Sequence, residues 1–427
     1  MDNKINVLIF PSEGMNAIEL HDALSTCVNI KTYGASSVKR HGRFIFENYI
    51  NNIVNINDES FIDNINSIIN ENKINVIFPT HDSVAKFLVE NQNQINAKII
   101  SGDIFTVKVC RSKNATYNLF RDCDFIPKRY TCINEVTTYP LFSKPDEGQG
   151  AIGTKIINNA KNLIDFDFNN NILTEYLPGE EYTIDCLTDN KGNLRYISPR
   201  SRDRLMAGIA VAGEIKPKTS EIIQIAETIN SRLHFLGLWY FQIKKDKKGK
   251  WKLLEISTRC AGTMCLTRAK GINLPLLSVY TAMDYEIEVS DNDYEVEMDR
   301  ILTGLYNIKL EYNKVYIDFD DTITLNNKVN SKVIQYLYQC KNQNKEIILL
   351  TKHIHKIEET LNYYCISPLL FNKIITISGN DNKSIYIDAN KSIFIDNAYN
   401  ERKEVYRKHH IPVFDVDGVD FLIDRKY

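Results

Sequence analysis

The 427-residue sequence predicts an α/β and α+β protein of three domains, within the two to four that its length allows. In the first hundred residues, short apolar runs alternate with amphipathic runs. The middle of the chain is rich in strand patterns and contains a glycine-rich turn and a charged hairpin. From about Glu311, strand and helix patterns alternate again. Such alternation predicts a parallel sheet covered on both faces, so the two ends are expected to be α/β and the middle α+β.

The first expected domain covers residues 1–104. Apolar runs with the length of buried strands begin at four places: Ile5, Val28, Asn75 and Ala97. Helical patterns separate them, and in residues 61–71 the apolar residues recur at three- and four-residue spacing. The first turn, PSEGMN, lacks the G-x-G-x-x-G pattern, so no dinucleotide site is expected there.

The second expected domain covers residues 105–300. A helix carrying SKNATYNLF precedes the strand and turn of PLFSKPDEGQGAIGTK, which begins at Pro140. The stretch from Tyr240 to Ser257 has two apolar strands around a charged turn, which is the pattern of a hairpin. The acidic, apolar-poor segment 289–299 marks the edge of this domain, and residues 312–427 form the third expected domain.

The composition argues against several kinds of partner. Hydrophobic residues make up 43% and charged residues 25%, as in a globular protein with apolar cores. The formal net charge of −2 and the lack of a basic stripe argue against a nucleic-acid partner. There is no signal-peptide layout, and no run approaches the ~20 apolar residues of a membrane span. Nine scattered cysteines without a CxxC pair indicate a reducing compartment, so a cytoplasmic location is expected.

Two segments of the middle domain carry polar groups typical of a nucleotide site. Lys144 stands at a strand end before Gly148, Gly150 and Gly153. A lysine supplies charge there, and glycines permit close approach of the backbone, which suits a mobile loop over phosphates. The other segment, EYLPGEEYTID, is a strand, a turn and a strand with three glutamates, and by itself it also fits an exposed hairpin.

The charged hairpin is the third such segment. It places Gln242 on one strand and Glu255, Ser257 and Arg259 on its partner. Strand alternation puts the last three on one face. A carboxylate, a hydroxyl and a guanidinium inside an apolar hairpin are unfavourable without a ligand. A metal ion bridged to phosphate would relieve this, so the face is a candidate metal and phosphate site.

Together, in this order, the three segments resemble the ATP-grasp superfamily, in particular its carbamoyl-phosphate-synthetase-like and biotin-carboxylase-like members. The resemblance covers residues 1–297 and implies a Rossmann-like domain ahead of the ATP-grasp domain. It implies ATP and two Mg²⁺ ions as cofactors and a small-molecule carboxylate and an amine as substrates. ATP would phosphorylate the carboxylate, and the amine would attack the acyl phosphate to form an amide.

The resemblance assigns nucleotide-binding roles to several residues. Lys113 looks like the first lysine that contacts phosphate, and Lys144 looks like the second, ahead of the flexible loop that contains Gly150. The stretch from Glu175 to Leu177 resembles the interdomain hinge that holds adenine, and Glu181 resembles the ribose-binding acid.

Metal and substrate roles are assigned in the same way. Glu255 looks like the carboxylate that bridges two Mg²⁺ ions, with Gln242 beside it and Ser257 where Asn is usual. Arg259 would steady the transferred phosphoryl group. Three arginines suit the carboxylate substrate or its phosphate through forked contacts: Arg200, Arg202 and Arg204.

The C-terminal third contains a second cluster of polar residues. The stretch VYIDFDDT reads as a buried strand that ends in three carboxylates: Asp318, Asp320 and Asp321. Crowded carboxylates repel one another unless a metal or a charged substrate lies among them. Two later strand patterns end in Thr351 and Asp396, with Lys383 between them. By itself, the first motif also fits a capped strand-to-loop turn.

The order Asp-x-Asp, Thr, Lys, Asp resembles the haloacid dehalogenase superfamily of phosphatases, over residues 314–427. The resemblance implies a small Rossmannoid domain in which Asp318 is the nucleophile that forms an aspartyl phosphate and Asp320 is the general acid and base. Thr351 and Lys383 would bind the phosphoryl oxygens.

The same resemblance implies one Mg²⁺ ion in the C-terminal site, held by Asp318, Asp396 and the carbonyl of Asp320. Asn397 replaces a frequent second aspartate. Two further lysines lie near enough in the sequence to compete with Lys383 for its role: Lys373 and Lys391. The motifs leave little room for a large cap, so the pocket is expected to be open.

The two resemblances together predict a bifunctional enzyme, in which a ligase forms an amide and a phosphatase removes phosphate from a phosphorylated amine or amide product. The C-terminal domain resembles phosphatases of bacterial surface-polysaccharide pathways, which suggests capsule biosynthesis and a uronate or nucleotide-linked uronate as the carboxylate. Two other interpretations stay open: an amino-acid or dipeptide ligase, and a degenerate ATP-grasp module that only binds nucleotide or sugar. A homodimer also stays open, and neither a nucleic-acid nor a membrane partner is expected.

Overall fold

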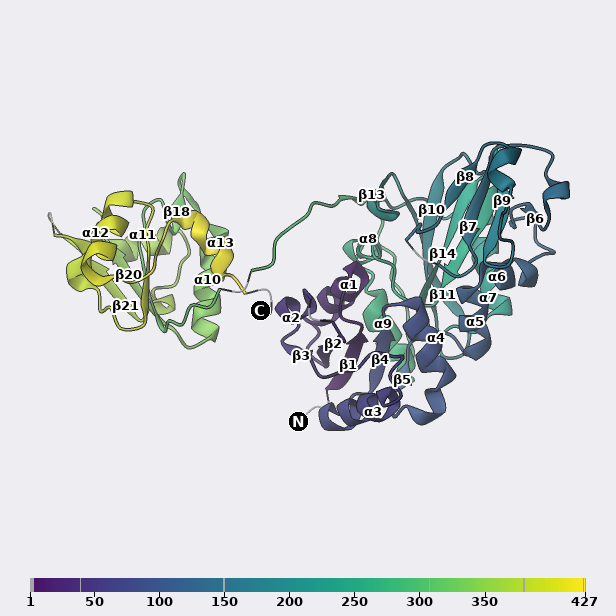
Figure 1. The fold of residues 1–427 in the computed structure, drawn as a ribbon. Helices are drawn as coiled ribbons and strands as arrows, with labels where there is room; N and C mark the ends of the chain where they lie inside the picture. Colours follow the sequence, from purple (N-terminus) through teal and green to yellow (C-terminus); the bar gives the residue numbers. More distant parts are fainter. Residues whose placement is uncertain are drawn as a thin grey trace. The chain divides into compact units, whose positions relative to one another are not determined.

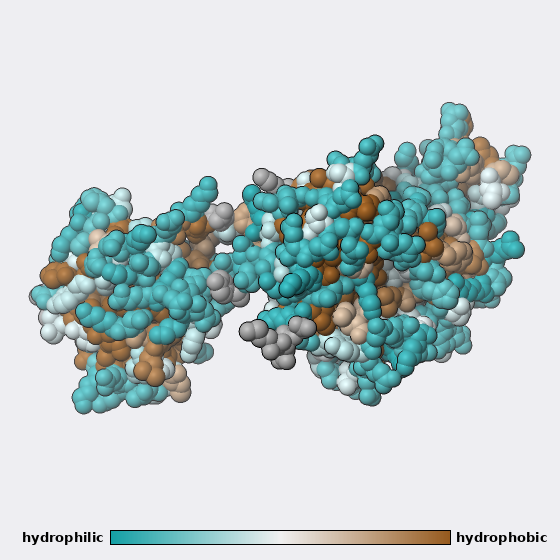
Figure 2. Space-filling model, turned by 90° about the horizontal axis from the view of Figure 1, so that it is seen from below, coloured by the Kyte–Doolittle hydropathy of each residue, from teal (hydrophilic) through white to brown (hydrophobic). Residues whose placement is uncertain are grey.

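The structure, a computed structural model, describes residues 4–38, 40–148, 150–306, 308–378, 381–424 and 426. The chain divides into two compact units, Met1–Thr303 and Gly304–Tyr427. Hydrophilic residues cover most of the face seen in Figure 2. Among the residues described, no helix has the length and apolar character needed to cross a membrane.

The first unit begins with a five-stranded parallel sheet of order β3-β2-β1-β4-β5 (Figure 1). Its strands are β1 (Ile5–Phe10), β2 (Ile30–Ala35), β3 (Asn48–Ile50), β4 (Val76–Pro79) and β5 (Lys98–Ile99). The connecting helices are α1 (Met15–Leu24), α2 (Gly42–Ile45), α3 (Phe61–Asn72) and α4 (Asp82–Glu90). The central strand β1 is almost wholly buried because helices cover both faces of a parallel sheet. The predicted parallel sheet is confirmed, whereas the short elements α2 and β3 were not predicted.

An antiparallel sheet of order β6-β9-β7-β8 follows α5 (Ile104–Arg111) and α6 (Lys113–Leu119). Its strands are β6 (Arg129–Tyr130), β7 (Leu141–Pro145), β8 (Lys155–Ile157) and β9 (Asn171–Glu175). A small apolar core lies against this sheet and includes Tyr130, Leu141 and Leu173. The glycine-rich turn joins β7 to β8, which pair as a hairpin.

A larger antiparallel sheet has the order β11-β10-β14-β15. Its strands are β10 (Glu181–Thr188), β11 (Leu194–Ser201), β14 (Gly237–Lys245) and β15 (Trp251–Ser257). Side chains alternate along these strands, and one face packs Ile184, Trp239 and Phe241 with the apolar side of α7 (Ser220–Arg232). The opposite face carries polar side chains, among them Thr183 and Gln242, as well as apolar ones such as Leu187 and Leu238. The predicted hairpin is confirmed as β14 and β15.

The glutamate-rich segment EYLPGEEYTID connects these two antiparallel sheets. It leaves β9 at Glu175 and enters β10 at Glu181, and the two strands belong to different sheets. The exposed hairpin that the segment also fitted is therefore wrong. The rest of the first unit comprises α8 (Cys265–Ala269), α9 (Leu274–Ala282) and a small sheet of β12 (Arg204–Met206), β13 (Ile209–Glu214) and β16 (Glu297–Asp299).

The second unit contains another parallel sheet, of order β21-β20-β17-β22-β23. Its strands are β17 (Lys314–Ile317), β20 (Glu346–Thr351), β21 (Lys373–Thr376), β22 (Ser392–Ile395) and β23 (Val413–Phe414). Its helices are α10 (Ser331–Asn342), α11 (Ile357–Tyr363), α12 (Tyr399–His409) and α13 (Val419–Leu422). The carboxyl ends of the neighbours β20, β17 and β22 meet at one edge, where polar groups from distant segments gather.

The connection from β17 to β20 contains few elements. It contains the two-residue strands β18 (Thr324–Leu325) and β19 (Lys328–Val329), followed by α10. In this fully described stretch there is no domain-sized insertion that would form a cap over the sheet edge.

Candidate functional sites

One row of side chains crosses the larger antiparallel sheet of the first unit. Arg200 is in register with Thr183, Thr183 with Gln242, and Gln242 with Glu255. Neighbours in register on antiparallel strands point to the same face. This is the face opposite the apolar core, so the sheet presents a polar row that ends at Glu255.

Lys144 on β7 lies beside Glu255 and is 7% exposed. Its Nζ donates hydrogen bonds to the carbonyl of Leu254 at 2.8 Å and to the hydroxyl of Tyr117 at 3.0 Å. Burial lowers the pKa of Lys144 to about 8, while the nearby carboxylates of Glu255 and Glu181 oppose that change. A bound polyphosphate would favour the charged form of Lys144 and raise its pKa.

Lys113, the first residue of α6, supplies a second buried ammonium. Its Nζ donates to the carbonyl oxygens of Asp146 at 3.1 Å and Gly148 at 3.5 Å. Burial lowers the pKa of Lys113, Glu255 raises it, and Lys144 lowers it further. The two lysines and Glu255 therefore share one electrostatic environment, although 31 and 111 residues separate them along the chain.

The glycine-rich turn has the backbone that its sequence suggests. Gly150 and Gly153 have φ angles of 64° and 78°, in the left-handed region that other residues rarely adopt. A Cβ at Gly153 would also lie 2.8 Å from a ring carbon of Pro145, whereas one at Gly150 would meet nothing within 4 Å. The turn is thus constrained at Gly153 and open at Gly150.

The predicted adenine and ribose residues lie along the connection between the two antiparallel sheets. Oε1 of Glu175 accepts a hydrogen bond from the backbone N–H of Lys128 at 2.8 Å, and Leu177 is buried. Glu181 is 2.7 Å from Arg202 and 3.0 Å from Lys244. The Glu181 carboxylate is thus already neutralised by two cations.

Asp82, at the start of α4, was not predicted as a site residue. It accepts a 2.7 Å hydrogen bond from the hydroxyl of Ser257 and bonds of 3.0 and 2.9 Å from Arg259. Burial raises the pKa of Asp82, but the Arg259 charge and these hydrogen bonds outweigh burial and leave it lowered. An acidic residue at the start of a helix is common, so the sequence held no signal that Asp82 meets β15.

The three predicted substrate arginines lie in different surroundings. Arg200 is 0% exposed, and its guanidinium donates to both carboxylate oxygens of Asp185 at 2.8 and 2.9 Å and to the hydroxyl of Thr263. The charge of Arg200 is neutralised by Asp185 inside the protein. A substrate would reach Arg200 only after these two side chains separated. Arg202 pairs with Glu181, and Arg204 pairs with Asp299 at a half-exposed position.

The residues present can hold Mg²⁺ in the first unit only with help from the nucleotide. Glu255 is the single carboxylate among the three expected ligands, and the Ser257 hydroxyl is engaged by Asp82. Over the described ranges, no group of three or more His, Cys, Asp or Glu side chains is arranged for a metal ion. Phosphate oxygens would therefore supply most of the ligands of any metal at Glu255.

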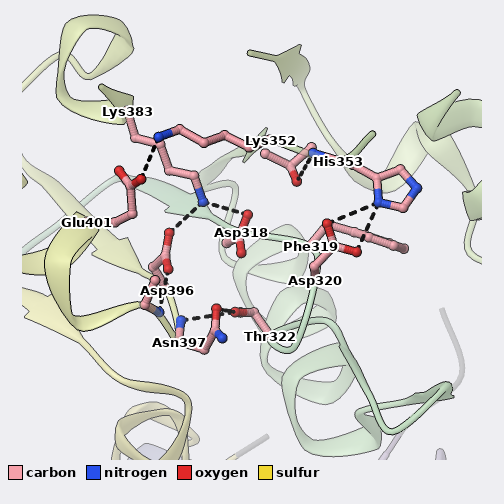
Figure 3. Close-up of polar contacts among 12 residues, drawn as sticks. Asp318, Phe319, Asp320, Thr322, Lys352, His353, Lys383, Asp396, Asn397 and Glu401 are labelled. Carbon is pink, nitrogen blue, oxygen red and sulfur yellow. Dashed lines mark hydrogen bonds and ion pairs between the residues drawn. The ribbon is translucent and has the colours of Figure 1, made fainter. Parts of the chain in front are cut away.

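In the second unit, Lys383 lies between two buried carboxylates (Figure 3). Its Nζ is 2.6 Å from Oδ1 of Asp318 and 2.6 Å from Oδ2 of Asp396. Asp318 directly follows β17 and Asp396 directly follows β22, so the parallel sheet brings them together. Lys373 and Lys391 are exposed, so Lys383 is the one of these three lysines that reaches the carboxylates.

Burial governs the electrostatics of this trio. It raises the pKa of Asp318 to about 6, against the opposing effect of the Lys383 charge. Burial also raises the pKa of Asp396, whereas the two carboxylates hold the pKa of Lys383 above its usual value. Two buried carboxylates that share one ammonium fit a second cation, so Asp318, Asp396 and the Asp320 carbonyl would hold a Mg²⁺ ion.

The other predicted phosphatase residues lie at the same edge of the sheet, where β17 and β20 end side by side. Thr351, the last residue of β20, is fully buried, and its Oγ1 accepts a hydrogen bond from the backbone N–H of His353 at 3.1 Å. The side-chain carboxylate of Asp320 lies against the ring of His353 at 2.9 Å. His353 was not predicted, and the signal available was its place two residues after Thr351 in the motif TKH.

Asn397, which stands where a second aspartate is frequent, is hydrogen-bonded to Thr322. Its backbone N–H donates to Oγ1 of Thr322 at 3.2 Å, and its own Oδ1 is 3.4 Å from the same oxygen. Arg402 donates to the carbonyl oxygens of Asp396 and Asn397 at 2.6 and 2.8 Å. These bonds fix the loop after β22 and so the position of the Asp396 carboxylate.

Comparisons with known proteins identify the fold of the first unit. Residues 167–302 match the family described as "ATP-grasp in the biosynthetic pathway with Ter operon". A solved biotin carboxylase from Campylobacter jejuni, in a β,γ-ATP complex, has a TM-score of 0.54 and 15% identity. That match covers 66% of this chain and 72% of the other. No curated protein matches the chain.

Two further solved structures agree. An L-amino acid ligase from Bacillus licheniformis has a TM-score of 0.52 and 16% identity, over 66% of this chain and 75% of its own. An N5-carboxyaminoimidazole synthetase from Staphylococcus aureus, with ADP bound, has a TM-score of 0.56 and 13% identity, over 67% and 79%. About two thirds of this chain therefore has the ATP-grasp fold.

Proposed function

We propose that the chain is a bifunctional enzyme. The first unit is an ATP-dependent ligase that joins a carboxylate to an amine through an acyl phosphate. The second unit is a Mg²⁺-dependent phosphatase that removes phosphate from a phosphorylated amine or from the amide product. The three-domain division at residues 1–104, 105–300 and 312–427 belongs to the same proposal.

The convergence of Lys113, Lys144 and Glu255 supports the ligase. Two partly desolvated ammonium groups next to a carboxylate can hold a polyphosphate and its metal ion together. Arg259, released from Asp82, would then stabilise the charge on the transferred phosphoryl group. Gln242 and Ser257 would lie beside the metal ions. Glu175 and Leu177 would hold the adenine, and Glu181 would bind the ribose.

The placement of Lys383 between Asp318 and Asp396 supports the phosphatase. Asp318 would attack phosphorus and form an aspartyl phosphate, while Thr351 and Lys383 bind the phosphoryl oxygens. Mg²⁺, when bound, supplies positive charge that keeps Asp318 ionised and offsets charge on the phosphoryl group. Asp320 would give a proton to the leaving group and later take one from water.

The carboxylate substrate is proposed to be a uronate or a nucleotide-linked uronate, in the synthesis of a surface polysaccharide. The matching family is described by a biosynthetic pathway, which agrees with a synthetic reaction. Of the three predicted arginines, Arg204 is half-exposed and Arg202 is 10% exposed, whereas Arg200 is fully buried, so Arg202 and Arg204 are the proposed ligands of this carboxylate. An amino acid is the second candidate, because an L-amino acid ligase shares the fold.

Mass spectrometry of the reaction products tests both activities at once. The chain would be incubated with ATP, Mg²⁺, a panel of uronates and amino acids, and a panel of free and phosphorylated amines. Wild type is compared with Glu255→Gln and with Asp318→Asn. Matched controls are Glu286→Gln and Asp420→Asn, which change exposed carboxylates outside both sites.

Each outcome separates the alternatives. A phosphorylated amide that accumulates with Asp318→Asn and is dephosphorylated by wild type supports the sequential bifunctional enzyme. Loss of amide with Glu255→Gln, but not with Glu286→Gln, supports the ligase site. If no panel member gives ADP and an amide, while wild type still releases phosphate from phosphorylated amines, the first unit is a binding module and the ligase proposal fails.

A further inference from the structure

The turn that follows β1 in the first unit holds buried polar atoms that have no partner. Ser12 is 0% exposed, and its hydroxyl makes no hydrogen bond. The side chain of Glu13 is 9% exposed, and its Oε1 is likewise buried and unpaired. On β3 of the same sheet, the hydroxyl of Tyr49 is another such atom. A buried polar atom without a partner is unfavourable, so these atoms call for a ligand.

The three side chains lie close to one another. A Cβ added at Gly42 would lie 2.6 Å from Oγ of Ser12 and 3.0 Å from Oε1 of Glu13, so both oxygens face the same point. Burial raises the pKa of Tyr49, and the carboxylate of Glu13 raises it further, so the phenol lies in the field of that carboxylate. We call Ser12, Glu13 and Tyr49 the turn cluster.

Glu13 lacks a cation to balance its charge. Its Oε2 accepts a hydrogen bond from the backbone N–H of Gly42 at 3.3 Å and lies 3.5 Å from Nδ1 of His41. Nε2 of His41 accepts a hydrogen bond from the N–H of Gly14 at 2.9 Å, so the hydrogen of this ring is on Nδ1 and the ring is neutral. In the part of the chain that the structure describes, no lysine or arginine forms an ion pair with Glu13. A buried carboxylate in this state favours a cationic ligand.

The turn is joined to the residues proposed to act on the phosphoryl group. The hydroxyl of Thr80, which follows β4, donates to the carbonyl oxygen of Pro11, and the amide of Asn16 donates to the carbonyl oxygen of Thr80. Thr80 therefore holds both ends of the turn. Two residues later, Asp82 accepts the hydrogen bonds of Arg259. The turn cluster thus lies near the place where the acyl phosphate is proposed to form.

The loop after β15 also approaches this turn. A Cβ at Gly262, three residues beyond Arg259, would lie 3.6 Å from the Cβ of Met15. Met15 is 41% exposed and lies two residues after Glu13. A small molecule can therefore reach the turn beside Glu13 from solvent, at the junction of the parallel sheet with the loop that carries Arg259.

A primary ammonium group matches the turn cluster. It carries one positive charge and three N–H donors, and the cluster offers one carboxylate oxygen and two hydroxyl oxygens as acceptors. A divalent metal ion is a poorer match, because only one of these oxygens is charged. The proposed ligase needs an amine beside the acyl phosphate, and the residues assigned so far hold nucleotide, metal ions and the carboxylate.

We infer that Ser12, Glu13 and Tyr49 bind the primary ammonium group of the amine substrate. The inference rests on the proposed ligase function and names the chemical class of its second substrate, an amine that is charged and carries three N–H groups when it binds. The three residues are assigned to binding, and no bond changes there.

Two nucleophiles test the site because only one of them is charged. Hydroxylamine is uncharged at neutral pH and converts an acyl phosphate to a hydroxamate, whereas ethylamine is an ammonium ion and gives an amide. Steady-state kinetics on the full chain, with ATP, Mg²⁺ and the panel of uronates and amino acids, would compare wild type with Glu13→Gln. We expect kcat/KM for ethylamine to fall about 10- to 100-fold through KM, and that for hydroxylamine to change less than about threefold, because only the ammonium loses a charge-assisted hydrogen bond.

Saturation-transfer NMR measures binding of the amine without turnover. Ethylammonium should give a signal with wild type and lose most of it with Glu13→Gln. Tetramethylammonium has the same charge but no N–H donor, so its signal should be weaker than that of ethylammonium in wild type. Glu47→Gln is the matched control, since it removes an exposed carboxylate just before β3, and it should behave like wild type in both experiments.

Two further variants separate binding from a structural role. Ser12→Ala and Tyr49→Phe each remove a buried hydroxyl that has no partner. Such a hydroxyl adds nothing to stability, so the midpoint of urea unfolding should not fall in either variant, while the ethylammonium signal should weaken in both. A lower midpoint together with an unchanged ethylammonium signal shows a purely structural role and overturns the inference.

The other outcomes are also decisive. Equal losses with both nucleophiles in Glu13→Gln show that Glu13 serves activation of the carboxylate or the fold, and an unchanged kcat/KM for ethylamine shows that Glu13 binds no amine. Absence of an ethylammonium signal with wild type overturns the inference as well. If wild type forms no hydroxamate from any uronate or amino acid, the ligase proposal fails. An ethylammonium signal that depends on Glu13 would then still assign an amine site to the turn cluster.

Discussion

The hydroxyl of Ser257 donates a 2.7 Å hydrogen bond to Asp82, a residue 175 positions earlier in the chain. Two further bonds from Arg259 reach the same carboxylate. This contact ties the end of β15 to the start of α4, so it joins the polar face of the antiparallel sheet to the parallel sheet of the first unit. Asp82 holds the arginine that is proposed to contact the transferred phosphoryl group.

The Asp82→Asn variant is expected to lower the free energy of unfolding of the first unit by about 3 kcal/mol, because it leaves the mostly buried charge of Arg259 unpaired. Urea unfolding followed by tryptophan fluorescence measures this, since both tryptophans, Trp239 and Trp251, lie in that unit. Asp284→Asn, a change at an exposed ion pair, should alter stability by less than about 1 kcal/mol. Equal effects of the two variants would contradict the prediction.

Binding of ATP with Mg²⁺ is expected to take up protons at pH 8 through Lys144. The pKa of this buried lysine is about 8 in the free protein, so roughly half of the molecules carry the neutral amine at that pH. The triphosphate favours the ammonium form and raises the pKa, so about half a proton is taken up. Calorimetry in two buffers of different protonation enthalpy measures the uptake.

The matched variants for this experiment are Lys144→Gln and Lys247→Gln. Lys247 lies in the exposed turn between β14 and β15, away from Glu255. The uptake should disappear with Lys144→Gln, along with at least a tenfold loss of affinity, and should persist with Lys247→Gln. Uptake that is unchanged in Lys144→Gln would mean that another group supplies the protonation.

The Lys383→Met variant is expected to destabilise the second unit by about 3–5 kcal/mol, because it leaves two buried carboxylates without their cation. Mg²⁺ should recover part of this loss, since a divalent cation can bind the same carboxylates. Hydrogen exchange of peptides that contain β17 reports on this unit. Lys373→Met, at an exposed position, is the control, and faster exchange in both variants alike would argue against a specific role of Lys383.

The stability of the first unit is expected to fall in acid through His21. This histidine is 6% exposed on α1, with the ring of Phe46 at a centroid distance of 4.6 Å, and burial lowers its pKa to about 4. Below pH 6.5 the unfolded chain takes up a proton that the folded chain refuses until about pH 4. The contribution of His21 is therefore complete above pH 6.5 and falls by about 1.4 kcal/mol per pH unit below it.

Urea unfolding at pH 7 and pH 5 tests the His21 prediction. Wild type should lose about 2 kcal/mol more than His21→Gln between these two pH values, from the same linkage. His234→Gln, at an exposed position, should behave like wild type. A wild type and a His21→Gln variant with the same pH dependence would show that His21 is not the group responsible.

Most strands and helices could be predicted from the sequence because their signals are local. The apolar run from Ile5 and the periodic pattern of residues 61–71 became β1 and α3. The short elements α2 and β3 were missed because four and three residues carry too little periodicity. The segment from Glu175 to Glu181 shows a further limit, since its sequence could not tell whether the two strands share a sheet.

By itself, the sequence determined which side chains stand at the ends of which strands. Asp318, Thr351 and Asp396 follow or end apolar runs, and a parallel sheet brings such ends to one edge. Alternation likewise determined that Glu255 and Ser257 share a face of β15. These conclusions need only the repeat of a strand, which a few neighbouring residues establish.

Only the tertiary structure decided which charge meets which partner. It paired Arg200 with Asp185 inside the first unit, Arg259 with Asp82 across 177 residues, and His353 with Asp320 across 33. It also selected Lys383 over two nearby lysines. The physical reason is that ion pairs and hydrogen bonds depend on distances of about 3 Å in space, which no local pattern along the chain encodes.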